Sequence, residues 1–268
     1  MVDAFGPPDW RRLYFGQEFC ERRAPTVCDV RRAYAAAASA GLAFSLLTSY
    51  VSDEGLGRLR PVLAWLSGLG DPRIEVVAND WGVVRLVAHE HAPLRLVLGR
   101  LMNRMLRDPR IVPGLVAARA PGDALSALRQ PSLAAPVSRR LLAQFGVERV
   151  ESDNLIQGLD TDFAAIGLGA SVYVPYGYVV TGRACAIGSL NQPAADQFHA
   201  GAACRRECLR YTVTRRVAPM PVAGGHREYV ERGNTCCYFQ DAAAIDRAAA
   251  VARRAGIDRL VYQADLPV

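Results

Sequence analysis

The feature that most constrains the fold is an alternation of short apolar runs with longer runs of helical periodicity. β-Branched and aromatic residues predict strands at 11–16, 43–50, 73–80, 93–100, 147–154 and 171–182, with a last short strand at 258–265. The spacing of apolar residues predicts helices at 28–40, 56–68, 137–145 and 241–255. Strands that alternate with helices pair in parallel, so we expect an α/β fold, a TIM-like (β/α) barrel that is either complete or lacks one stave.

Two segments depart from this alternation. Residues 107–136 contain five prolines and are predicted to form a long loop over the barrel mouth. Residues 182–208 carry three of the seven cysteines and are predicted to be a late insertion; the region after Cys208 is less regular, and its segments 209–216 and 227–240 are predicted to be extended. We therefore expect a barrel with one cysteine-bearing insertion.

The length of the chain indicates one domain. Its 268 residues are enough for a single large domain with a substantial core, over residues 1–268. The sequence has no signal-peptide pattern, and no apolar run approaches the ~18 residues that a membrane span needs. We expect a soluble, cytoplasmic protein without a membrane span.

Polar residues follow the predicted strands at five places: Gln17-Glu18, Thr48-Ser49, Asn79-Asp80, Arg100 and Glu151-Ser152-Asp153. The carboxyl ends of parallel barrel strands open on one face, where ligands bind. Any one of these residues could instead cap the next helix, but five in succession favour a site. An arginine there can pair with a substrate carboxylate, and acidic groups can orient hydroxyls or move protons. The predicted substrate-binding residues are Asn79, Asp80, Arg100, Glu151 and Asp153.

The cysteines suggest a metal site. Cys204 and Cys208 are separated by three residues, so both sulfurs can face one point. Cys185 follows a predicted strand and Cys20 follows the first one, which puts both on the open face of the barrel. Four thiolates there would complete an iron–sulfur or a tetrahedral zinc site, and inert buried cysteines are the third alternative. The paired C-x2-C halves of a zinc ribbon are absent, which favours iron–sulfur.

The three other cysteines are predicted to be packing residues. Cys28 begins a helix, where we expect a small buried side chain. Cys236 and Cys237 are adjacent on an extended run, so their side chains should point to opposite faces.

The composition restricts the remaining functions. All 32 basic residues are arginine, which excludes a Schiff-base lysine and a P-loop lysine. The net charge of +6 and the pI of 9.1 leave an anionic ligand or RNA open, but the arginine pairs are scattered, so we favour a salt-bridged surface. The run His89-Glu90-His91 is interpreted as an exposed turn between two strands rather than as a metal pair.

Four motifs resemble the U-thirty-two (collagenase-like) peptidase family: LYFGQEFCERR at 13–23, VVANDWGVVRL at 76–86, ERVESD at 148–153, and GRAC followed by C-x3-C at 182–208. Within it the chain is most similar to the UbiV-like subunits of oxygen-independent ubiquinone biosynthesis. The resemblance implies a (β/α) barrel that holds a 4Fe-4S cluster through Cys20, Cys185, Cys204 and Cys208. It also implies a heterodimer with a longer homologous (UbiU-like) subunit, and hydroxylation of a small aromatic substrate without molecular oxygen.

The same resemblance leaves other functions open. Family members with added domains act on RNA, so an RNA-hydroxylation factor is the second candidate. A peptidase is the third, although the sequence offers no convincing pair of nucleophile and base. A scaffold without enzymatic activity is the fourth.

Overall fold

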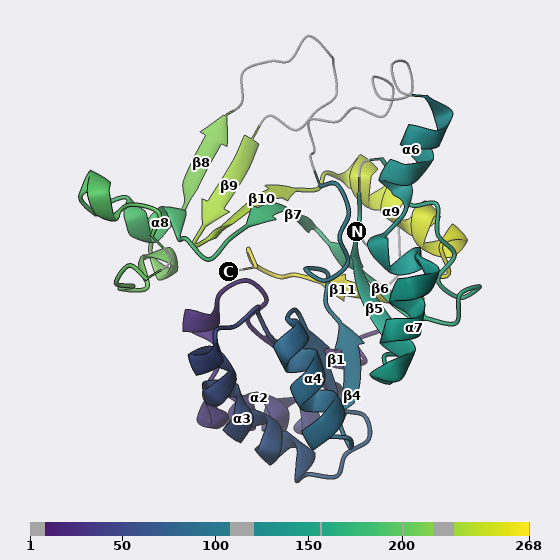
Figure 1. Ribbon diagram of the computed structural model, residues 1–268, viewed down its shortest axis with the longest axis horizontal. Helices are drawn as coiled ribbons and strands as arrows, with labels where there is room; N and C mark the ends of the chain where they lie inside the picture. The colour runs from purple at the N-terminus through teal and green to yellow at the C-terminus, as the bar shows by residue number, and fades with distance from the viewer. Residues whose placement is uncertain (1–8, 108–120, 156, 200, 217–227, 268) are drawn as a thin grey trace.

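A seven-stranded parallel sheet forms the larger part of the molecule (Figure 1). The computed structural model describes residues 9–107, 121–155, 157–199, 201–216 and 228–267. Neighbouring strands in the sheet are β1 (Arg12–Gly16), β2 (Ala43–Leu47), β3 (Glu75–Ala78), β4 (Arg95–Leu98), β5 (Arg149–Asp153), β6 (Gly169–Val174) and β11 (Arg259–Tyr262). Every pair is parallel, which confirms the α/β class.

Helices connect these strands and cover the sheet. They are α2 (Val27–Ser39), α3 (Asp53–Ser67), α4 (Trp81–Glu90), α6 (Gly122–Arg129), α7 (Pro136–Gln144) and α9 (Ala242–Arg254). Alternate strand residues point to opposite faces of the sheet, so Leu46 and Val76 join the main hydrophobic core. Their neighbours Ser45 and Glu75 are hydrogen-bonded to each other at 2.9 Å. The opposite face of the sheet therefore carries buried polar groups.

The parallel sheet is curled, and its two edge strands face each other. Arg259 on β11 donates a hydrogen bond to the Tyr14 hydroxyl on β1 at 2.8 Å, and the rings of Trp10 and Tyr262 lie 6.0 Å apart. Among the described residues, no strand pairs with the outer edge of β1 or β11. The sheet thus has the curl of a barrel but is open between these two strands.

An antiparallel sheet is inserted between β6 and α9. Its order is β7 (Tyr176–Thr181), β10 (Thr235–Phe239), β9 (Glu228–Arg232) and β8 (Val213–Arg216), and the short helix α8 (Ala186–Ser189) lies beside it. Figure 1 shows β8, β9 and α8 extending away from the parallel sheet. The predicted single strand at 171–182 is therefore wrong. Pro175 separates β6 from β7, because proline cannot donate to a ladder and the chain changes sheet there.

The base of this insertion packs on the ends of the parallel strands. Phe19, Tyr178 and Cys237 form a small buried hydrophobic cluster. The Tyr178 hydroxyl donates to the Arg100 carbonyl at 3.2 Å, and Asn154 donates to the Gln240 side chain at 3.0 Å. The two sheets are thus joined through buried contacts.

Two local predictions differ from the structure. His89 and Glu90 are the last residues of α4 and His91 follows as its C-cap, so this run ends a helix instead of forming a turn between strands. In the predicted loop at 107–136, residues 108–120 lie outside the described part of the chain, and α6 and a 3-10 turn (Ser132–Ala134) follow.

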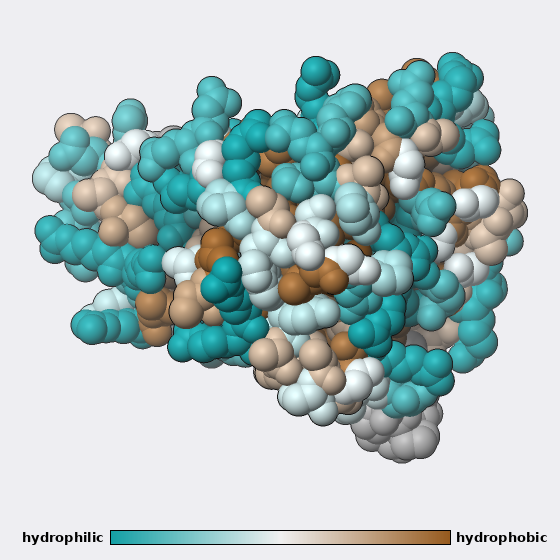
Figure 2. Space-filling model, turned by 90° about the horizontal axis from the view of Figure 1, so that it is seen from below, coloured by the Kyte–Doolittle hydropathy of each residue, from teal (hydrophilic) through white to brown (hydrophobic). Residues whose placement is uncertain are grey.

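The surface and the helices add two observations. Hydrophilic residues cover much of the face seen in Figure 2, and the apolar residues on it form separate patches. Of the helices in the described ranges, none combines the length and apolar character needed to cross a membrane.

Candidate functional site

The structure brings the four predicted ligand cysteines together. Cys20, Cys185, Cys204 and Cys208 all line one cavity of about 220 Å³. Cys20 follows β1, Cys185 is the N-cap of α8, and Cys208 lies in a 3-10 turn (Glu207–Leu209) with Cys204 shortly before it. The cavity therefore lies where the carboxyl end of β1 meets the insertion.

Side-chain hydrogen bonds hold the cysteine-bearing segments against each other. The side-chain amide of Asn234 donates to the Phe19 carbonyl at 2.7 Å and to the Gly182 carbonyl at 2.6 Å. It also donates to the Tyr50 hydroxyl at 3.0 Å. Arg22 donates to the Ala202 carbonyl, which joins the Cys20 segment to the loop before Cys204. The convergence of the cysteines thus depends on contacts between residues far apart in the sequence.

The environment of the sulfurs suits a bound cation. Burial raises the pKa of both Cys20 and Cys185, and neighbouring cysteine sulfurs raise it further. Backbone N–H groups oppose this effect: those of Arg22 and Arg23 lower the pKa of Cys20, and that of Gly188 donates to the Cys185 sulfur at 3.2 Å. The Arg206 N–H donates to the Cys204 sulfur at 3.4 Å. A metal centre would supply the positive charge that these thiolates need.

The donor set fits an iron–sulfur cluster. Four thiols are its usual ligands, and N–H groups directed at sulfur are among the groups that set its potential. In the parts of the chain that are described, no three His, Cys, Asp or Glu side chains are grouped to hold one metal ion.

The other cysteines lie outside this cavity. The predicted burial of Cys28 is wrong: its side chain is exposed, because it lies in the first turn of α2 on the solvent side. On β10, Cys237 is fully buried and Cys236 is half-buried, as alternate faces require. Burial raises the pKa of Cys236 to about 11 and of Cys237 to about 12, so both stay protonated at neutral pH.

Two of the predicted substrate-binding residues bind the backbone of their own chain. Asn79 donates to the Thr48 carbonyl at 2.8 Å and accepts from the Leu101 N–H at 3.0 Å. Asp80 caps α4 by accepting from the Gly82 N–H at 2.7 Å. In this structure both residues hold strand ends in place, and their role in substrate binding stays a prediction.

Arg100 and Asp153 belong to a buried ion-pair network. Arg100 is fully buried and donates to both carboxylate oxygens of Glu18 at 2.7 Å and to Asp153 at 2.9 Å. Its guanidinium lies 4.0 Å from the ring centre of Tyr173. Arg107 also pairs with Asp153, at 2.6 Å. Because these charges neutralise each other, Arg100 has no unpaired charge to offer a substrate carboxylate.

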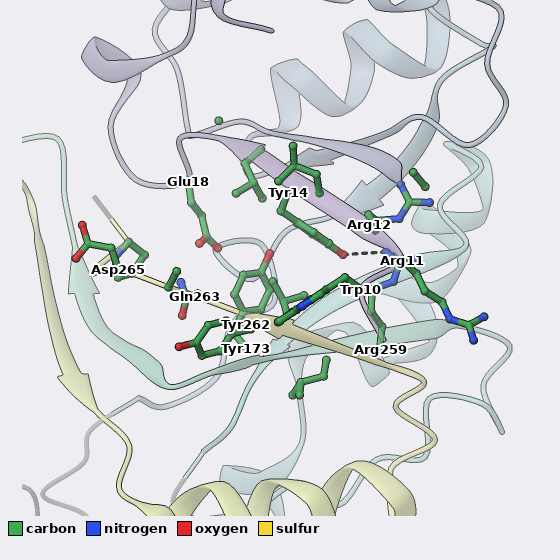
Figure 3. Close-up of a pocket in the computed structure, with 18 of the residues that line it drawn as sticks. Trp10, Arg11, Arg12, Tyr14, Glu18, Tyr173, Arg259, Tyr262, Gln263 and Asp265 are labelled. Atoms are coloured by element: carbon green, nitrogen blue, oxygen red, sulfur yellow. Dashed lines mark hydrogen bonds between the residues drawn. The ribbon is translucent and has the colours of Figure 1, made fainter. Parts of the chain in front are cut away.

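A second, larger cavity was not predicted. It has a volume of about 1120 Å³ and lies between β1 and β11 (Figure 3). Trp10 and Tyr14 contribute to it from the β1 side, and Tyr173, Arg259 and Tyr262 from β6 and β11. Polar residues at alternate positions within the strands were the sequence pattern that could have indicated this cavity. The prediction considered only the polar residues at strand ends.

Glu151, the last predicted residue, does not line this cavity but contacts Tyr14, which does. It is fully buried on β5, and its Oε1 accepts a hydrogen bond from the Tyr14 hydroxyl at 3.2 Å. Burial raises the pKa of Glu151 to about 7, and the negative charge of Glu18 adds to this effect.

No family model, curated protein or solved structure matches the chain. Membership of the U-thirty-two family therefore stays a prediction from the motifs.

Proposed function

We propose that this chain is an iron–sulfur protein that holds a 4Fe-4S cluster through Cys20, Cys185, Cys204 and Cys208. The observation that carries the proposal is the single cavity that all four cysteines line, while Cys28, Cys236 and Cys237 lie elsewhere. The cluster would supply one-electron transfer. The chain's own contribution is to hold the four segments together and to direct backbone N–H groups at the sulfurs.

The wider role in this proposal comes from the family resemblance. As a member of the U-thirty-two peptidase-like family, the chain would be a subunit of an oxygen-independent hydroxylation system of the ubiquinone-biosynthesis type. It would act on a small aromatic substrate as a heterodimer with a longer homologous (UbiU-like) subunit. The curled sheet would then be a TIM-type barrel that lacks one stave, consistent with its open edge between β1 and β11.

Cluster binding is tested by replacing a ligand and a matched control cysteine. Cys204 and Cys28 are both exposed, so substituting either with alanine leaves the core intact. After anaerobic purification, we expect the wild-type chain and Cys28→Ala to be brown and to contain iron and sulfide in equal amounts. We expect Cys204→Ala to lose the colour and most of the iron and sulfide.

Two results would contradict the assignment. If Cys204→Ala keeps a full complement of iron and sulfide, Cys204 is not a ligand. If the wild-type chain contains one zinc ion and no sulfide, the site is a zinc site. With the cluster established, anaerobic formation of a hydroxylated aromatic product in the presence of the second subunit would test the wider role.

A further inference from the structure

The inner face of the sheet next to the large cavity carries two phenol groups and one carboxyl group in contact. Tyr14 lies on β1, Tyr173 on β6 and Glu151 on β5. Tyr14 and Tyr173 line the cavity, and their rings meet edge to face with centroids 6.3 Å apart. Figure 3 shows both side chains directed into the space between β1 and β11. Segments far apart in the chain thus supply one compact polar group.

The hydrogen bonds of this group have a direction. Arg259 donates to the Tyr14 oxygen at 2.8 Å, and Tyr14 then donates to Glu151 Oε1 at 3.2 Å. The dashed line in Figure 3 marks the first of these bonds. Arg259 is itself held by two bonds to Glu75, at 2.7 and 3.0 Å. The Tyr14 oxygen therefore lies between a fixed cation and a carboxyl group.

Two buried atoms of the group make no hydrogen bond of normal geometry. They are the Tyr173 hydroxyl and Glu151 Oε2; Tyr173 is 1% exposed and Glu151 is 0% exposed, and the Tyr173 hydroxyl lies close enough to the carboxyl group to lower the pKa of Glu151. A buried polar atom without a good hydrogen bond is costly, so such atoms are uncommon unless a ligand or water completes them. Since Tyr173 lines the cavity, a ligand in the cavity can supply its partner.

We propose that the large cavity is a binding site for a small molecule with a weakly acidic hydroxyl, a phenol or an enol, and that Tyr14 and Glu151 accept its proton. In this step the ligand O–H bond breaks and its proton passes to the Tyr14 oxygen. The Tyr14 proton passes at the same time to Glu151 Oε1. The ligand is left as an oxyanion that accepts a hydrogen bond from Tyr173, and no oxidant or reductant is needed.

The charges around Glu151 are compatible with this exchange. It faces Tyr14 on β1, Tyr173 on β6, Arg259 on β11, Glu75 on β3 and Glu18 after β1. Burial, the largest effect, favours the neutral acid, and the Tyr173 hydroxyl and then Arg259 favour the ionised form. The pKa of about 7 lets Glu151 both accept and release a proton near neutral pH. The ion pair between Arg259 and Glu75 is already satisfied and needs no ligand.

None of the four cysteines lines this cavity, so ligand binding there can be measured in the full chain with or without a cluster. The probe is β-naphthol, which like the tyrosine phenol keeps its proton near neutral pH, and its methyl ether, which lacks the hydroxyl. Binding of both is measured by naphthalene fluorescence across pH. The variants are Glu151→Gln and Tyr173→Phe. Tyr178→Phe is the matched control, because Tyr178 is a buried tyrosine that does not line the cavity.

For the wild-type chain we expect β-naphthol to bind about tenfold more tightly than its methyl ether, and more tightly as the pH rises through about 7, where Glu151 ionises. Glu151→Gln should abolish this pH dependence, which a purely structural role of Glu151 would not do. Tyr173→Phe should weaken binding of β-naphthol about tenfold, and Tyr178→Phe should behave like the wild type.

Three results would overturn the proposal. They are equal binding of β-naphthol and its methyl ether, an unchanged pH dependence in Glu151→Gln, and the absence of naphthol binding to the folded wild-type chain. None of these depends on iron content, so failure here is distinguishable from failure of the cluster assignment.

Discussion

Replacing Arg100 with methionine should destabilise the protein strongly. Arg100 is fully buried, and its two bonds to Glu18 are the ion pair that neutralises that carboxylate. Asp153 keeps a second partner in Arg107, so the main loss is at Glu18, which is 4% exposed. Removing one partner of a buried pair costs about 3–5 kcal/mol. A domain is stable by about 5–15 kcal/mol, so we expect Arg100→Met to lose a large part of its stability.

The free energy of unfolding is measured by urea titration, with tryptophan fluorescence as the signal. Variants are compared on the condition that their transitions have the same slope. Arg11→Met is the control, because Arg11 forms an ion pair with Asp9 on the open surface and its loss should leave the free energy of unfolding nearly unchanged. Adding Glu18→Gln to Arg100→Met removes the unpaired charge and should recover most of the lost free energy.

A loss of less than about 1 kcal/mol in Arg100→Met would show that the pair behaves like a solvated one and would refute the expected cost of a buried unpaired charge. So would a double variant in which Glu18→Gln fails to recover stability. In that case, the shape of the guanidinium against Tyr173, and not its charge, would be the source of the loss.

Two further predictions concern the candidate sites. Because the folded pKa of Glu151 is about 7, above its unfolded value of 4.5, its contribution to stability is complete below about pH 4.5 and is lost as the pH rises through about 7. Denaturant unfolding should therefore show Glu151→Gln gaining up to about 3 kcal/mol over the wild type between about pH 4.5 and 8, and an equal difference at both pH values would contradict this. Asn234→Ala should lose iron to a chelator several-fold faster than the wild type, because Asn234 joins the Cys20 and Cys185 segments. Equal rates of loss would show that this clamp has no effect on the cluster.

The local elements of the fold could be predicted from periodicity. The predicted strand at 11–16 is Arg12–Gly16, and the predicted helix at 28–40 is Val27–Ser39. The apolar spacing that indicates these elements depends only on neighbouring residues. Helix α4 was not predicted, because its buried residues Val83, Val84, Leu86 and Val87 form a short valine-rich run that is equally typical of a strand. The capping residue Asp80 was the remaining signal for that helix.

The split at Pro175 and the second sheet depend on tertiary contacts. β7 pairs with β10, about sixty residues later in the chain, and no local pattern specifies that partner. The convergence of the cysteines was within reach of the sequence, since Cys20 follows β1 and the others follow β7. Their mutual placement also needs Asn234, which lies in the turn between β9 and β10.

Strand ends alone do not predict the large cavity: Glu18 lines it from the end of β1, but Tyr14 and Arg259 line it from positions within β1 and β11. Glu75, within β3, binds Arg259. Tyr14, Glu75 and Arg259 meet only because the sheet curls enough to bring β11 opposite β1. A flat sheet would leave these three groups separate, and each would then look like an ordinary exposed side chain. The curl is set by packing of the whole sheet and has no local signature.

The turn after β1 links the two candidate sites. Glu18 lines the large cavity, Cys20 lines the cysteine cavity, and Arg23 lines both. Between them, Phe19 packs against Tyr178 and Cys237 of the insertion. The ion pair of Glu18 with Arg100 fixes the start of this turn inside the barrel, and Asn234 fixes it from the insertion through the Phe19 carbonyl. A few buried contacts therefore set the position of Cys20 relative to the inner face of the sheet, so the geometry of either site depends on the same short segment.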